Sequence, residues 1–119
     1  MNYTVVNTNG KSYLHLLPGW QITGYHDVID IIQACGENSV DRILVEADNL
    51  PETFYDLRTG LAGVILDRLS VYKVRAGFLV PAEWLTSCRF AEMALEANRG
   101  FEYHYSTDRN EIIQWLEKL

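Results

Sequence analysis

The sequence predicts an α/β fold in which a mixed sheet of about five strands is covered by about four helices. Two β-rich runs at the N-terminus flank a turn, which predicts an antiparallel hairpin. Short apolar runs then alternate with segments of helical periodicity, which favours parallel strands joined through helices. The predicted order is strand, strand, helix, strand, helix, strand, helix, strand, helix, in a single domain over residues 1–119.

The hairpin is predicted from residues 3–6 and 12–17, which are rich in aromatic and β-branched side chains. Between them, residues 7–11 read Asn-Thr-Asn-Gly-Lys, and both Asn and Gly tolerate a positive φ. Pro18 and Gly19 end the second strand, because Pro lacks the donor that a ladder needs.

The helices and later strands follow from a change of period. Val28, Ile31, Ile32 and Cys35 stand at i, i+3, i+4 and i+7, which predicts one apolar helical face. Buried strands are predicted over residues 42–45 and 74–80, and helices over 61–69 and 84–98. An aromatic strand over 101–105 and a helix from Asp108 complete the fold, with Glu111 as a capping-box partner.

Composition excludes several classes of protein. Of the 119 residues 48% are hydrophobic and 22% charged, which is typical of a folded globular domain. The formal net charge of −6 argues against nucleic-acid binding and against attraction to an anionic membrane. The N-terminal residues lack the pattern of a signal peptide, so we expect a cytoplasmic protein.

Residues that could carry chemistry are scattered. Cys35 and Cys88 have no CxxC or Cys/His spacing, so buried, unreactive thiols are expected. The spacing of the histidines does not require a metal site, and that of the acidic residues after the third strand does not require an acid/base pair. The histidines are His15, His26 and His104, and the acidic residues are Glu46, Asp48 and Glu52. We therefore predict no metal, no cofactor and no catalytic residue.

The candidate site is a polar turn that precedes the second predicted helix. It contains Asp56, Arg58, Thr59, Gly60 and Gly63. Thr59 is either a helix N-cap or a hydroxyl that accepts phosphate, because a helix start offers unpaired N–H groups to both. The glycines either allow a partner to approach or allow close packing.

Two apolar residues could border this turn. Trp84 and Leu85 follow Pro81 in the loop beyond the fourth strand. An exposed Trp there would be an interface anchor, whereas a buried one would belong to the core.

Residues 56–68 resemble a segment of the STAS fold of bacterial anti-sigma-factor antagonists, which carry Asp-Ser-Ser-Gly-Leu followed by Gly-Val-Ile-Leu. Here the run is Asp-Leu-Arg-Thr-Gly-Leu-Ala-Gly-Val-Ile-Leu-Asp-Arg. Thr-Gly-Leu-Ala-Gly and Asn98-Arg99-Gly100 are also similar to a family of small bacterial STAS-like domains of unknown function. In the antagonists the hydroxyl residue before Gly-Leu is reversibly phosphorylated, which switches binding to a kinase-like partner. The resemblance places Thr59 at that position.

Three hypotheses for function follow. The first is a non-enzymatic STAS-like interaction module, regulatory and phosphorylation-switched at the start of the second helix, that binds a protein partner. The second is a small-ligand-binding protein or enzyme with a pocket near the helix starts. The third is a homodimer whose assembly is its function.

Overall fold

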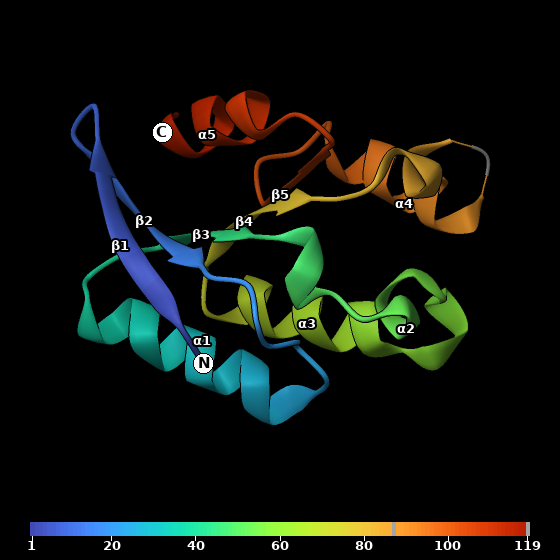
Figure 1. Ribbon diagram of the computed structural model, residues 1–119, viewed down its shortest axis with the longest axis horizontal. Coiled ribbons are helices and arrows are strands. Elements are labelled where there is room, and N and C mark those ends of the chain that lie inside the picture. Colours follow the sequence, from blue (N-terminus) through green and yellow to red (C-terminus); the bar gives the residue numbers. More distant parts are fainter. Residues whose placement is uncertain (87, 119) are drawn as a thin grey trace.

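A mixed five-stranded sheet forms the centre of the protein, whose computed structural model describes residues 1–86 and 88–118 (Figure 1). The strands lie side by side in the order in which they occur along the chain. β1 is antiparallel to β2, and the remaining neighbours are parallel. The strands are β1 (Tyr3–Thr8), β2 (Lys11–Leu16), β3 (Arg42–Val45), β4 (Arg75–Leu79) and β5 (Tyr103–Ser106). The predicted α/β class, hairpin and parallel strands are confirmed.

The hairpin turn consists of Asn9 and Gly10. Both residues have positive φ, 49° and 77°. Two successive positive φ values between the paired residues Thr8 and Lys11 define a type I′ turn, whose twist matches that of the strands. The local sequence Asn-Gly is therefore sufficient to explain the hairpin register.

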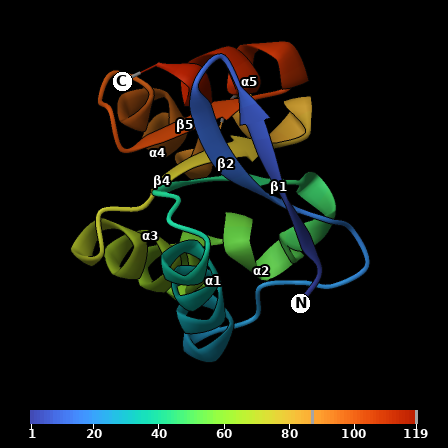
Figure 2. The ribbon, with the colours of Figure 1, turned by 90° about the vertical axis from the view of Figure 1, so that its left-hand side faces the viewer.

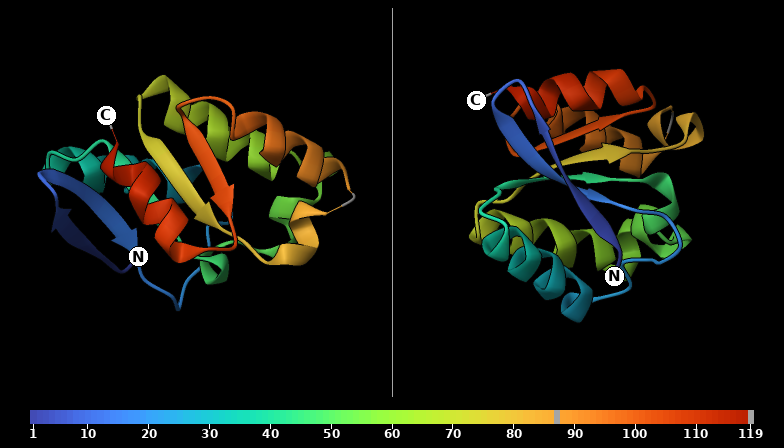
Figure 3. Two further views of the ribbon diagram at one scale, coloured as in Figure 1. Left: turned by 90° about the horizontal axis from the view of Figure 1, so that it is seen from above. Right: turned by 60° about the vertical axis from the view of Figure 1, so that its left-hand side comes forward.

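Five α-helices pack around the sheet in the described residues: α1 (Tyr25–Glu37), α2 (Glu52–Tyr55), α3 (Leu61–Val71), α4 (Arg89–Ala97) and α5 (Arg109–Glu117). α1, α2 and α3 cover one face, and α5 lies against the opposite face (Figures 1 and 2). α4 packs beside β5 (Figure 3), and its Phe90 and Ala94 join the same core as α1 and α3.

Two segments differ from the predicted elements. Residues 52–55 form the short helix α2, which the sequence did not predict; it begins after the extended Pro51 and buries Phe54 and Tyr55. The predicted helix 84–98 begins later, at Arg89, where the Cys88 sulfur accepts a hydrogen bond from Ala91 N at 3.4 Å. Trp84 and Leu85 belong instead to the 3₁₀ helix η3 (Ala82–Leu85).

The face beneath α1, α3 and α4 is held by apolar side chains. Phe54 is fully buried, with its ring centroid 5.7 Å from that of Phe78 and 5.5 Å from that of Phe90. Phe78 stacks on Tyr105 at 4.8 Å. Large buried aromatic rings contribute most of the apolar area that a core of this size removes from water.

The face beneath α5 is smaller and more polar. Ile112, Trp115 and Leu116 of α5 pack on Tyr13 and Leu44. Gly77 makes this approach possible, because a Cβ atom built there would lie 2.5 Å from Ile112 Cγ2. A glycine at this position lets α5 lie close to β4.

Two arginine side chains donate hydrogen bonds to carbonyl groups at the C-terminal end of α5. The guanidinium of Arg42, a residue only 5% exposed, donates to Leu116 O at 2.6 Å and also to Lys118 O. Arg75 donates to Lys118 O at 3.4 Å and lies 4.5 Å from the ring centroid of Trp115. The last carbonyls of a helix need such donors, and they also favour a positive charge.

The two outer edges of the sheet differ. The side-chain amide of Asn98, just after α4, accepts from Tyr105 N at 2.7 Å and donates to Tyr105 O at 2.9 Å. It therefore occupies the two backbone groups of Tyr105, which a further strand at this edge would use. β1 forms the other margin of the sheet (Figure 3).

Candidate functional site

The predicted turn contains the 3₁₀ helix η2 (Leu57–Thr59), which is capped by Asp56. Asp56 Oδ1 accepts from Arg58 N at 3.1 Å and from Arg58 Nε at 3.0 Å, and Oδ2 accepts from Nη2 at 3.0 Å. Hydrogen bonds from Arg58 hold the pKa of the Asp56 carboxyl below its ordinary value. Two of the predicted site residues thus form one exposed ion pair.

Thr59 does not cap the second predicted helix, α3, directly. The N-cap is Gly60, which has a left-handed φ of 79° and provides no side chain. The Thr59 hydroxyl lies 2.7 Å from Thr53 O and 2.9 Å from Asp56 O, and it accepts from Leu61 N at 3.3 Å. Because a hydroxyl carries one proton, Thr59 can donate to only one of these two carbonyls at a time. Thr59 therefore links the turn to α2 by a hydrogen bond, and it stabilises the start of α3 from the residue before the N-cap.

The glycines of the turn are not required for close packing. A Cβ atom built at Gly60 or Gly63 would meet no heavy atom within 4 Å. Gly60 is needed for its positive φ, which costs other residues conformational energy. Gly63 is exposed on the first turn of α3, so its backbone is accessible.

The structure brings Asp56 and Arg58 beside Trp84 and the start of α4. These elements enclose a pocket of about 320 Å³, lined by Tyr55, Asp56, Leu57, Arg58, Trp84, Cys88, Arg89 and Phe90. A second hollow, of about 540 Å³, is lined by Leu57, Arg58, Arg89, Glu92 and Met93. Thr59, Gly60, Gly63 and Leu85 do not line either pocket, and Leu85 packs against the core.

Tyr55 is the residue of this pocket that sequence reasoning missed. Its ring stacks on Trp84 with a centroid distance of 4.6 Å and an angle of 3°. Its hydroxyl is buried and has no hydrogen-bond partner among residues 1–86 and 88–118. Burial, assisted by the charge of Glu83, raises the pKa of Tyr55 to about 12. A buried hydroxyl without a partner can contribute to binding a ligand that brings an acceptor.

Arg89 was also missed. It is the first residue of α4 and is exposed. No carboxylate in the described part of the chain lies within ion-pair distance of it, whereas Arg58 is paired with Asp56. Its position in the sequence does not indicate a binding site, because Arg58 and Arg89 are far apart in the chain and line the same pockets only in the folded protein.

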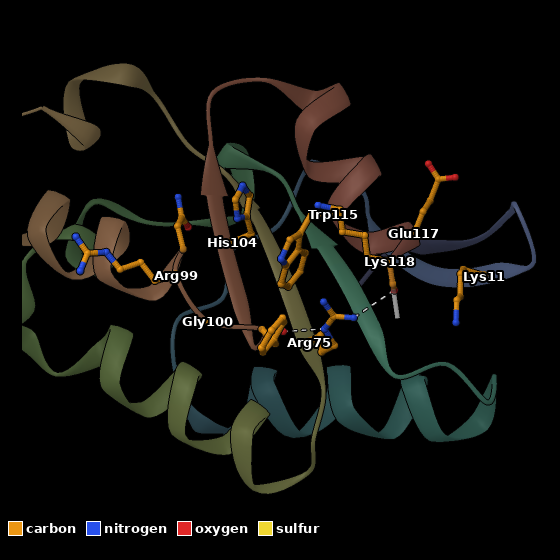
Figure 4. A pocket seen from close by; sticks show the side chains of 10 residues that line it. Lys11, Arg75, Arg99, Gly100, His104, Trp115, Glu117 and Lys118 are labelled. Carbon is orange, nitrogen blue, oxygen red and sulfur yellow. Dashed lines mark hydrogen bonds between the residues drawn. The ribbon is translucent and has the colours of Figure 1, made fainter.

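A larger cavity, of about 690 Å³, lies between the end of α5 and the starts of β4 and β5 (Figure 4). Trp115 points into it from α5, and Lys11 and Arg99 stand on opposite sides (Figure 4). His104 stacks on Trp115 with centroids 5.6 Å apart. The lining residues are Lys11, Arg75, Asn98, Arg99, Gly100, Phe101, His104, Trp115, Glu117 and Lys118. The chemistry of this cavity is aromatic and cationic.

The remaining candidates form structural contacts. Glu46 Oε2 lies 2.6 Å from His15 Nε2, and Arg109 Nη2 donates to Glu46 Oε1 at 2.8 Å. Asp48 instead accepts from Gly19 N at 2.8 Å. These acidic residues therefore do not combine into a pair with divided acid and base roles. No group of three or more His, Cys, Asp and Glu side chains suited to a metal ion occurs in residues 1–86 and 88–118.

Cys35 is buried in α1, and burial raises the pKa of its thiol to about 12. A thiol with so high a pKa is a poor nucleophile.

No helix of the described residues is long and apolar enough to cross a membrane.

The chain is thus a small α/β domain with two adjoining hollows at the turn and a cationic cavity at the end of α5. The family described as a domain of unknown function, DUF4180, matches residues 8–116. The chain belongs to this family. No curated protein matches the chain. No solved structure matches it either.

Proposed function

We propose that this chain is a non-enzymatic, STAS-like interaction module of the bacterial cytoplasm that binds an acidic segment of a protein partner. The binding site is the turn surface, which we define as Leu57, Arg58, Trp84, Arg89 and Met93, with the Tyr55 hydroxyl behind it. One observation carries the proposal: in the described residues, two arginines and a tyrosine whose buried hydroxyl has no partner line one pocket, beside the exposed Leu57 and the half-buried Met93.

Charge favours an acidic partner. The protein has a net charge of −6, yet the charged residues that line the turn pocket are two arginines, Arg58 and Arg89, and one carboxylate, Asp56. A carboxylate entering this pocket would accept hydrogen bonds from the Arg89 guanidinium and from the Tyr55 hydroxyl. Leu57, 37% exposed, and Met93 provide apolar contact around that charge.

We also propose that phosphorylation of Thr59 would switch binding at this surface. Thr59 is exposed, and its hydroxyl donates to one of two backbone carbonyls. A phosphorylated oxygen has no proton to donate, so this contact to Thr53 or Asp56 is lost and the turn rearranges. The added negative charge would also engage Arg58 and repel an acidic partner.

A selection of acidic and neutral peptides from a random display library tests the proposal. We expect enrichment of segments that combine Asp or Glu with apolar residues. Arg89→Glu should lower the affinity of a selected peptide at least tenfold, as measured by fluorescence polarisation, because an attraction becomes a repulsion. Thr59→Glu should lower it, whereas Thr59→Ser should leave it unchanged.

The matched control is Arg99→Glu, which makes the same charge change at an exposed residue remote from the turn surface. Equal losses for Arg89→Glu and Arg99→Glu would mean that net charge alone drives binding. Peptides without acidic residues, or affinity unchanged in Arg89→Glu, would contradict the proposal.

The cationic cavity supports a second candidate, a binding site for a small anion with a flat apolar part. Lys11 and Arg99 could meet negative groups on its two sides, while Trp115 and Phe101 supply apolar surface. A thermal-shift screen of anionic aromatic metabolites tests this function. Arg99→Glu should abolish any rise in Tm and Arg89→Glu should preserve it; the reverse pattern would assign the ligand to the turn surface.

A further inference from the structure

We propose that β1 is the contact through which two copies of this chain pair, as antiparallel strands about a two-fold axis at Val5. This interface involves none of the turn surface. It follows from the backbone of β1, from its composition and from the contrast with the β5 edge.

Three residues of β1 direct their backbone groups away from the sheet. Leu17 N donates to Asn2 O at 3.0 Å, so residues 2 and 17 form a hydrogen-bonded pair. The register pairs Thr4 with His15 and Val6 with Tyr13. Because hydrogen-bonded and open positions alternate along an antiparallel pair, Thr4, Val6 and Thr8 bond to β2. Tyr3, Val5 and Asn7 therefore present their N–H and C=O groups outward.

This arrangement is complementary to itself. In an antiparallel pair centred on Val5, each copy of Val5 exchanges two bonds with the other copy, and Tyr3 faces Asn7. An interface in which the same patch serves both copies closes as a two-fold dimer. The outward backbone groups at the three positions are all used in that register.

The composition of β1 lacks the devices that normally protect an edge. Residues 3–8 read Tyr-Thr-Val-Val-Asn-Thr, with no charge and no proline. Exposed edges usually carry lysine, proline or a bulge that discourages pairing. Val5 is 36% exposed and would meet its own copy across the axis. Figures 2 and 3 show β1 at the margin of the sheet, with no element drawn along its outer side.

The opposite edge is protected, which makes β1 the edge for pairing. Asn98 occupies both outward groups of Tyr105, and β5 is only four residues long. A second copy that approached β5 would have to displace the Asn98 amide before any strand pairing formed.

A charge-swap experiment at position 5 tests the register. Sedimentation velocity of the wild-type protein from micromolar to near-millimolar concentration should show a monomer–dimer equilibrium. Val5→Lys and Val5→Glu should each shift it toward monomer, because like charges then stand opposite each other. An equimolar mixture of the two variants should restore dimers, which a variant that merely fails to fold cannot do.

Two further measurements test whether the contact runs through the backbone of β1. Val5→Pro removes an outward N–H that β2 does not use, and should yield a folded monomer by near-UV circular dichroism, while Val5→Thr should stay dimeric. In the wild-type dimer, the amides of Tyr3 and Asn7 should exchange more slowly than in Val5→Pro. A wild-type protein that stays monomeric throughout, or a mixture of Val5→Lys and Val5→Glu that stays monomeric, would overturn the proposal.

Discussion

The two faces of the sheet are held by different kinds of interaction. Along each strand the side chains alternate between them. Ile43 and Phe78 belong to the core under α1 and α3, whereas Arg42 reaches α5 and Gly77 presents its Cα to α5. The first face buries a continuous apolar cluster, whereas α5 is attached through a few apolar residues and several charged ones. The stability of the first face therefore depends on how well apolar side chains fill its volume, and that of the second face depends more on charge and hydrogen bonding.

The largest expected effect is at the apolar face. Phe54→Ala should lower the free energy of unfolding by about 3 to 5 kcal/mol, because it removes a fully buried ring and leaves a cavity. Urea denaturation at neutral and acidic pH should give the same loss, since no charge is involved. A loss below about 1 kcal/mol would mean that the cluster collapses around the gap.

Next in size is the buried arginine beneath α5. Arg42→Met should cost about 2 to 3 kcal/mol, because the carbonyls of Leu116 and Lys118 lose a charged donor. Hydrogen exchange should accelerate in α5 but not in α1. The matched control Arg58→Met, at the exposed ion pair, should cost less than about 1 kcal/mol. Equal acceleration in α1 and α5 would argue against local detachment.

A smaller loss is expected where α5 approaches β4. Gly77→Ala should destabilise the protein by about 1 to 2 kcal/mol, because the new Cβ would overlap Ile112 Cγ2. Ile112→Leu removes the Cγ2 methyl group at similar volume, so the double variant should lose less than the sum of the two single changes. Additive losses from thermal denaturation would place the strain elsewhere.

The smallest effect concerns Glu46 and pH. Burial alone would raise the pKa of Glu46, but hydrogen bonds from Arg109 and His15 hold it below the ordinary value of 4.5. The unfolded chain then binds the proton first, so this stabilisation is complete above pH 4.5 and is lost as the pH falls through the lower, folded pKa. Glu46→Gln should cost about 1 kcal/mol at pH 7 and flatten that acid-side slope. Glu52→Gln, at an exposed residue of α2, serves as control; a slope unchanged by Glu46→Gln would refute the assignment.

The fold was largely predictable because its signals are local. Asn9-Gly10 determines the hairpin, and the spacing of Val28, Ile31 and Cys35 predicts the buried stripe of α1. The start of α4 was not predictable, because a 3₁₀ turn after Pro81 competes with a continuous helix and both satisfy the same apolar pattern.

The candidate site was predictable only in part. Sequence reasoning located Asp56 and Arg58 in the turn and placed Trp84 beside it, and the structure brings these three residues to one pocket. Tyr55 and Arg89 were missed because one reads as a core aromatic and the other as a surface cation. The cationic cavity was missed because Lys11, Arg75, Arg99 and Lys118 lie on separate elements and converge only after the chain has folded.

The side chain of Asn98 has a consequence for growth in solution. By bonding both backbone groups of Tyr105, it hinders the addition of another copy's strand at the β5 edge of the sheet. Addition at both edges could otherwise extend the sheet without limit. With the outward groups of Tyr105 occupied, β1 is the freer of the two sheet edges in residues 1–86 and 88–118, and the proposed pairing would use it. Crowded copies of this chain should therefore stop at a discrete particle rather than elongate into fibrils. In the pairing that we propose, the amide of Asn98 thus limits the assembly to two copies.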